Sequence, residues 1–101
     1  MVASVRDPLF SLAVRRSESG TVVAVTGELD LATAPELEVA LAGAHGDVTV
    51  DLNATTFVDP SGLRVLLAAS ATRGEMRVLR RRGGAVARLL ALTDTEGRLQ
   101  V

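Results

Sequence analysis

Segments with the hydrophobic spacing of strands alternate along the chain with segments that have the spacing of helices. Some runs are β-branched or alternate apolar with polar positions, which is typical of strands; they cover residues 9–14, 21–26, 48–52 and 76–80, and a further short strand is expected at 98–101. Other segments place apolar residues at helical spacing; they cover residues 33–44, 60–73 and 86–93. Strands that alternate with helices predict an α/β domain with a mixed sheet.

Both of the first two predicted helices have recognisable start signals. Thr33 and Glu36 have the spacing of a capping box, in which the hydroxyl binds a helix amide and the acid reaches back. Asp59 suits the cap position of the second helix and Pro60 suits its first helical position. Ser61 is therefore expected in the first helical turn.

The composition indicates one small domain. The chain has 101 residues, of which 48% are hydrophobic and only Phe10 and Phe57 are aromatic. We expect a loose lead over residues 1–8 and one domain over residues 9–101. The chain has no cysteine, no signal-peptide pattern and no apolar run long enough to span a bilayer. These features predict a cytoplasmic protein without membrane partners, and the scarcity of aromatic residues argues against nucleic-acid binding.

Ser61 is the residue with the most distinctive chemical setting. A first-turn hydroxyl lies beside helix amides that lack partners, and a phosphate there would be well accommodated. Gly62 has no side chain, so a partner or an active site could approach Ser61 closely. A plainer interpretation is that Ser61 and Gly62 only shape the helix start. A serine hydrolase would need a base, and the only histidine, His45, lies in a separate loop.

Other chemistries have little support in the sequence. A phospho-accepting aspartate at Asp51 or Asp59 would need an acidic pair and a lysine, and the chain has no lysine. There is no P-loop and no carboxylate cluster with metal-ligand spacing. We therefore expect no catalytic activity, no metal and no cofactor. The basic run 80–82 is either a solvated strand end or a partner patch.

Two segments resemble the STAS domain family, which includes the bacterial anti-sigma factor antagonists. Residues 25–37, VTGELDLATAPEL, look like the family's second strand and first helix. Residues 50–52 and 56–63, VDL and TFVDPSGL, look like its third strand and phosphorylation loop, and residues 86–93 resemble its last core helix. The resemblance implies a mixed sheet of about four to five strands with helices packed mainly on one face.

The resemblance also implies a function. Family antagonists bind an anti-sigma factor that is also a serine kinase, which frees the sigma factor. The kinase then phosphorylates the serine before Gly-Leu, here Ser61, and the complex separates; a PP2C-type phosphatase resets the switch. The residues expected to contact the partner are Asp30, Thr33, Asp59, Pro60, Gly62, Leu63 and Arg64.

The sequence departs from the commoner Asp-Ser-Ser-Gly-Leu motif, because Pro60 replaces the first serine and stiffens the loop that a kinase must grip. A phosphate at Ser61 would lie beside the acids Asp30 and Asp59, and Arg64 could moderate the charge. A penalty of about 3 kcal/mol would weaken partner binding roughly a hundredfold. The alternative within the same fold is a STAS interaction module in a signalling assembly, without a phospho-switch. The alternative from another class, with less support, is a small hydrolase or ligand-binding domain that uses Ser61 at the helix start.

Overall fold

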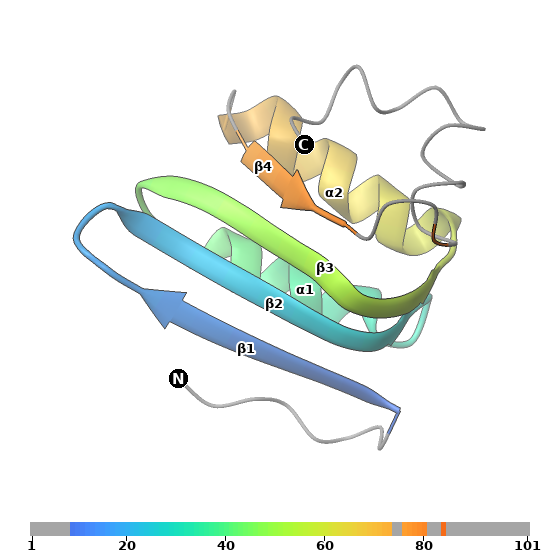
Figure 1. The fold of residues 1–101 in the computed structure, drawn as a ribbon. Helices are drawn as coiled ribbons and strands as arrows, with labels where there is room; N and C mark the ends of the chain where they lie inside the picture. Colours follow the sequence, from blue (N-terminus) through green and yellow to red (C-terminus); the bar gives the residue numbers. More distant parts are fainter. Residues whose placement is uncertain (1–8, 74–75, 81–83, 85–101) are drawn as a thin grey trace.

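The computed structural model describes residues 9–73, 76–80 and 84, which form a sheet and two helices (Figure 1). The elements are β1 (Phe10–Arg16), β2 (Gly20–Leu29), α1 (Ala34–Ala42), β3 (Asp47–Val58), α2 (Pro60–Arg73) and β4 (Met76–Leu79). This order confirms the predicted sequence of strands and helices up to residue 80. The helix expected at 86–93 and the strand expected at 98–101 lie outside the described residues.

The four described strands form one mixed sheet in the order β1-β2-β3-β4. β1 and β2 are antiparallel and are joined by a short turn, in which the amide of Ser17 donates to the carbonyl of Gly20 at 2.8 Å. β2 pairs with β3, and β3 with β4, in parallel. Parallel pairing requires crossover connections, which α1 and α2 supply.

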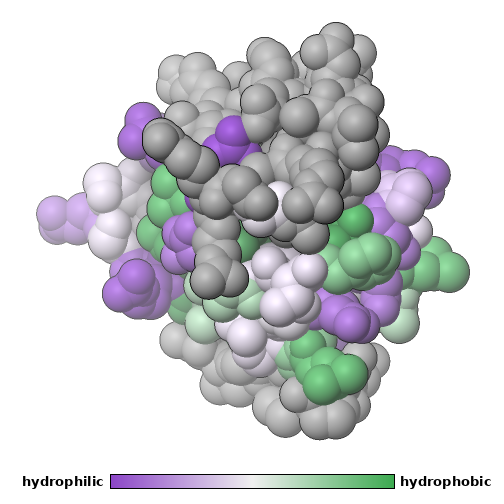
Figure 2. All heavy atoms as spheres, turned by 45° about the vertical axis from the view of Figure 1, so that its right-hand side comes forward, coloured by the Kyte–Doolittle hydropathy of each residue, from purple (hydrophilic) through white to green (hydrophobic). Residues whose placement is uncertain are grey.

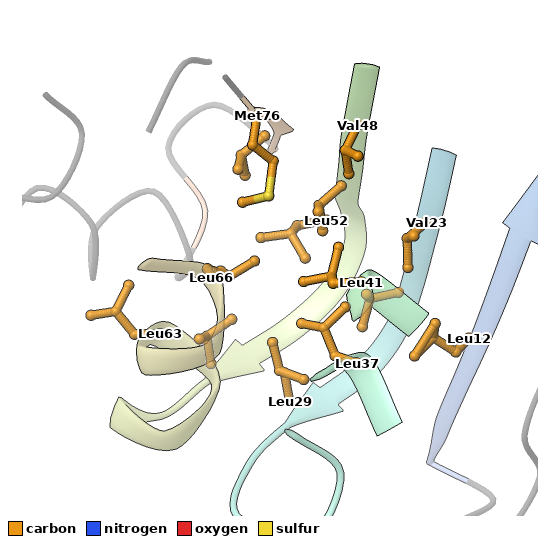
Figure 3. Close-up of a cluster of buried hydrophobic side chains, with 14 of the residues drawn as sticks. Leu12, Val23, Leu29, Leu37, Leu41, Val48, Leu52, Leu63, Leu66 and Met76 are labelled. Carbon is orange, nitrogen blue, oxygen red and sulfur yellow. The ribbon is translucent and has the colours of Figure 1, made fainter. Parts of the chain in front are cut away.

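Both helices cover the same face of the sheet, behind the strands in the view of Figure 1. Alternate strand positions point toward these helices, so the core collects every second strand residue. Figure 3 shows that side chains from β1, β2, β3 and β4 meet those of α1 and α2, including Leu12, Val23, Leu37, Leu66 and Met76. The predicted mixed sheet with helices on one face is confirmed.

Two of the strands run further than the sequence pattern predicted. β2 continues to Leu29 and β3 continues to Val58, so residues 53–58, which follow the predicted strand at 48–52, are also strand. The pairing register shifts between Ala24 and Thr26 and again between Gly27 and Glu28. Both shifts place an extra residue in β3, which interrupts the alternation of buried and exposed positions after Leu52 and hid the extension of that strand. In β2 the buried positions keep their alternation up to Leu29, but Gly27 breaks the run of apolar residues by which the strand was predicted.

The carboxyl end of α1 is tied to α2 by an arginine. One guanidinium nitrogen of Arg73 donates to the carbonyls of Leu41 at 2.8 Å and Ala44 at 2.7 Å. Carbonyls at a helix end lack intrahelical partners, and a cation there also complements the helix dipole. This link fixes the two helices against each other. Neither α1 nor α2 is long and apolar enough to cross a bilayer.

Candidate functional site

The candidate site lies where β2 and β3 end side by side. Leu29 pairs with Val58 at the last position of the parallel ladder, and the amide of Asp59 donates to the carbonyl of Leu29 at 3.0 Å. Asp30 and Asp59 directly follow these strand ends. The carboxyl edge of parallel strands is where functional groups gather in open α/β sheets. The fold therefore brings Asp30 to the same edge as Ser61.

Asp59 caps α2 as predicted, with Pro60 at the first helical position. Its Oδ1 accepts the amide of Ser61 at 2.8 Å and the amide of Gly62 at 3.1 Å. These are amides that an isolated helix would leave without partners. The expectation that a phosphate at Ser61 would find them unpaired is therefore wrong, because the carboxylate of Asp59 already occupies them.

Ser61 is half-buried and is flanked by two exposed residues, Pro60 and Arg64. Arg64 follows Ser61 by three positions, so the two residues lie on neighbouring turns of the same helix face. These three residues present the helix start to the outside. Of the predicted partner contacts, Pro60 and Arg64 are the most accessible.

Gly62 faces inward, not toward a partner. A β-carbon built at this position would lie 2.6 Å from Cγ of Leu29 and 3.1 Å from its carbonyl oxygen. Real β-carbons do not approach other heavy atoms as closely as 2.6 Å, so only glycine lets α2 lie this near β2. The idea that Gly62 leaves room for a partner is wrong, since Leu29 fills that room.

Leu63 also belongs to the interior, with 8% of its surface exposed. Figure 3 places its side chain on α2 at the margin of the core cluster, near Leu66. Gly62 and Leu63 were both expected to contact a partner. The structure instead assigns them to positioning: they seat the first turn of α2 on the sheet and so determine where Ser61 lies.

Thr33 has a structural role different from the predicted one. Its hydroxyl donates to the carbonyl of Glu28 at 2.9 Å and accepts the amide of Asp30 at 2.8 Å, and only 2% of the residue is exposed. It makes no side-chain bond to α1. The predicted capping box with Glu36 is therefore wrong. The hydroxyl binds the end of β2 because the turn folds back on that strand.

Asp30 organises the turn that follows β2. Its Oδ1 accepts the amides of Ala32 at 3.0 Å and Thr33 at 3.1 Å, which is the local pattern of an Asx turn. Asp30 stays half-buried. Its carboxylate therefore has a fixed position at the edge that carries Asp59 and Ser61.

The sequence reasoning missed two exposed apolar side chains at this edge. Leu31 is 74% exposed and Phe57 is 48% exposed. Figure 2 brings forward the end of the molecule where β2 and β3 lead into the helices, and apolar side chains lie there among hydrophilic ones. A signal was present: Phe57 is one of only two aromatic residues and stands two positions before Asp59.

A family model agrees with this arrangement over nearly the whole chain. The model described as "Mlab, STAS domain" matches residues 12–101. The chain belongs to the STAS domain family. In this STAS domain, Ser61 occupies the start of α2 at the carboxyl edge of the sheet.

Solved structures show the same fold. An anti-sigma factor antagonist from Mycobacterium paratuberculosis is 26% identical with a TM-score of 0.78, over 97% of this chain and 87% of that one. A STAS-domain antagonist from Rhodobacter sphaeroides is 23% identical with a TM-score of 0.54, over 71% of this chain and 85% of that one. The antagonist SpoIIAA in its unphosphorylated form is 16% identical with a TM-score of 0.57, covering 78% of this chain and 79% of that one. No curated protein matches the chain significantly.

Proposed function

We propose that this STAS domain is an anti-sigma factor antagonist controlled by phosphorylation of Ser61. The unmodified domain binds an anti-sigma factor that has serine kinase activity, which frees a sigma factor, and phosphorylation ends the complex. The observation that carries the proposal is the position of Ser61, in a helix turn anchored by Asp59 at 2.8 Å and flanked by exposed Pro60. The antagonist from Mycobacterium paratuberculosis, with a TM-score of 0.78, supports the assignment of the class.

The charges around Ser61 favour release after phosphorylation. A phosphoserine carries about −1.5 to −2 charges near neutral pH. The nearby amides of Ser61 and Gly62 are bonded to Asp59, so they do not offset this charge unless Asp59 moves away. A docked partner excludes water, and the repulsion between the phosphate and the carboxylates is stronger there than in the free domain. Binding is therefore weakened more than the free domain is destabilised.

The size of the effect decides whether the switch is useful. A differential cost of about 3 kcal/mol changes the affinity roughly a hundredfold. Such a change is enough to reverse a competition between this domain and a sigma factor for one anti-sigma factor. Arg64, on the next turn of α2, offsets part of the charge, but it is exposed and therefore screened by salt. We expect a PP2C-type phosphatase to restore the unmodified serine.

The experiment that tests the proposal uses purified candidate kinases of the anti-sigma type. Each is incubated with the domain and Mg-ATP, and phosphate is located by mass spectrometry. We expect one phosphate per chain, at Ser61, and none in Ser61→Ala. Binding is then measured for the unmodified and the phosphorylated domain. Phosphate at another residue, or equal affinities for the two forms, would contradict the proposal.

One observation favours a second candidate, an interaction module of the same fold without a phospho-switch. Asp59 already holds the two helix amides that a phosphate would use, and Pro60 stiffens the loop. A domain of this kind would bind its partner in one state only. The same experiment separates the candidates: tight binding without any phosphorylation of Ser61 supports the module.

Catalysis by Ser61 itself is the least supported role. The only histidine, His45, lies in the loop between α1 and β3, where its backbone carbonyl accepts the hydroxyl of Thr21 at 3.0 Å. Ser61 follows the opposite end of β3. A serine nucleophile requires its base within hydrogen-bond reach. We therefore propose that the domain acts by binding and not by catalysis, and the predicted cytoplasmic location fits that role.

A further inference from the structure

We propose that Leu31 and Phe57 are the apolar anchors of a docking surface and that the acids Glu28, Asp30 and Asp59 around them select a basic partner surface. Together these five residues form an acidic rim at the ends of β2 and β3. This inference rests on the proposed function, because the occupant it names is the anti-sigma factor with kinase activity. It replaces Thr33, Gly62 and Leu63, which are buried, as the contact residues on this side of Ser61.

The backbone gathers the rim residues around one hydrogen bond. The amide of Asp59 donates to the carbonyl of Leu29 at 3.0 Å. Leu31 lies two residues beyond Leu29 and Phe57 lies two residues before Asp59. Two residues span at most about 7 Å of chain. Both apolar side chains therefore start close to the Leu29–Asp59 link, and the carboxylate of Asp59 holds the amide of Ser61.

Exposure distinguishes this pair from the rest of the described surface. Over residues 9–73, 76–80 and 84, the large hydrophobic side chains that are exposed belong to Leu9, Leu31, Val39, Phe57 and Leu79. Single exposed hydrophobic residues are normal on a soluble protein. Leu31 and Phe57 differ because each lies two residues from the hydrogen bond between Asp59 and Leu29, at the strand ends that lead to Ser61. A large aromatic and an aliphatic side chain near the centre of a contact are typical binding hot spots.

The cross-strand neighbour of Phe57 is an acidic residue, Glu28. Glu28 pairs with Phe57 across β2 and β3, and the adjacent pair, Leu29 and Val58, is buried. Successive strand residues point to opposite faces, so Glu28 and Phe57 lie together on the face turned away from the helices. The rim therefore extends from that face around the strand ends to Ser61.

The part of the chain that contains the rim carries acidic but no basic side chains of the lysine or arginine type. Between Arg16 and Arg64 the sequence has eight acidic residues and no lysine or arginine. Three of these acids, Glu28, Asp30 and Asp59, belong to the rim. A complementary partner surface has an apolar pocket bordered by lysine or arginine, which also accelerates association at low salt.

The test uses the unphosphorylated domain and the purified anti-sigma factor kinase that phosphorylates it, with the dissociation constant measured by titration calorimetry without nucleotide. Leu31→Asn and Phe57→Thr are expected to weaken binding by about tenfold or more each. Val39→Thr is the matched control, because Val39 is 73% exposed on α1 and outside the rim; its affinity should match the wild type. Glu28→Gln should slow association at low salt and have little effect at high salt.

The outcomes distinguish failure of the proposed rim from failure of the proposed function. If the wild type binds tightly and Leu31→Asn and Phe57→Thr bind equally well, the rim is overturned and the proposed function stands. If Val39→Thr weakens binding as much as Phe57→Thr does, the docking surface lies elsewhere. If the wild type binds none of the anti-sigma factor kinases, both the proposed function and the rim fail. Circular dichroism with thermal unfolding verifies that each variant is folded, so that lost binding reports on the surface.

Discussion

The side chain of Leu29 fills the space that a β-carbon at Gly62 would need. Such a β-carbon would lie 2.6 Å from Cγ and 2.8 Å from Cδ2 of this leucine, which is fully buried. The carbonyl of the same leucine accepts the amide of Asp59. Leu29 therefore positions the start of α2, which carries Ser61, in two ways: through its backbone before α2 begins and through its side chain under the first turn.

Gly62→Ala is expected to lower the free energy of unfolding by about 1–3 kcal/mol, because Leu29 and the first turn of α2 must separate. The change is measured by urea denaturation. Ser61→Ala is the control in the same turn, with an expected change within about 1 kcal/mol, since Ser61 is half-buried and keeps its backbone bond to Asp59.

A double-mutant cycle tests the cause. In a Leu29→Ala background the obstructing Cγ and Cδ atoms are absent, so Gly62→Ala should cost clearly less than in the wild type. Residues in contact give interaction energies of about 0.5–3 kcal/mol in such cycles. An additive result would show that the cost of Gly62→Ala does not arise from the side chain of Leu29, and would leave the carbonyl oxygen of Leu29, 3.1 Å from the added β-carbon, as the remaining contact.

Thr33→Val is expected to destabilise the fold although valine has nearly the same shape. The threonine hydroxyl is buried, and the change leaves both the carbonyl of Glu28 and the amide of Asp30 without their bonds at 2.9 and 2.8 Å. An unsatisfied group costs about 1–3 kcal/mol when it is fully buried; these two bonds are part-buried, so we expect a loss near the lower end of that range. The matched control is Thr56→Val on β3, where the residue is exposed and the same change should be nearly neutral. Equal effects in the two variants would refute the structural role of Thr33.

The contrast between Asp59 and Thr33 shows how far the sequence could predict this site. Both residues suit a helix cap, and both precede a proline in the chain. Asp59 accepts two amides of α2, as its spacing predicts. Thr33 binds the end of β2 instead. The choice depends on how the turn folds back on the strand, which is a property of tertiary packing and not of the local motif.

The bounds of the strands also could be predicted only in part from the sequence. The alternation of apolar residues correctly indicated β1, the first part of β2 and β3, and β4. It did not reveal the extension to Val58, because two extra residues in β3 interrupt the period there. It did not reveal the extension to Leu29 because Gly27 breaks the apolar run of β2. The position of Ser61 depends on these extensions. The inward orientation of Gly62 likewise follows from the close approach of α2 to β2, which no spacing in the sequence encodes.

Asp59→Ala is expected to lower the free energy of unfolding by about 1 kcal/mol, within the usual range for loss of a helix cap. Asp59→Asn should change it by only a few tenths of a kcal/mol, because the asparagine side-chain oxygen can accept the same two amides. Asp47→Ala is the control for loss of an exposed carboxylate at the other end of β3. Urea denaturation measures all three variants. Equal stability of the alanine and asparagine variants at position 59 would contradict the capping role.

The same Asp59→Asn variant isolates the charge of the cap from its hydrogen bonds, and this gives the sharpest test of the switch. In the wild type we expect phosphorylation of Ser61 to weaken binding to the anti-sigma factor kinase roughly a hundredfold, equivalent to about 3 kcal/mol. Removing one of the two nearby carboxylate charges should reduce that weakening to about tenfold. Because Asp59 also belongs to the acidic rim, both forms are measured at high salt, where loss of its charge should leave the affinity of the unmodified variant close to that of the wild type.

Two dissociation constants, for the phosphorylated and the unmodified form, are measured for each variant, and their ratio is compared with that of the wild type. Asp47→Asn serves as the control, because it removes an exposed acid from the far end of β3 and should leave the ratio at the wild-type value. The ratio in Asp59→Asn distinguishes two causes of release. A smaller ratio shows that the carboxylate of Asp59 repels the phosphate, whereas an unchanged ratio shows that this carboxylate does not contribute to release.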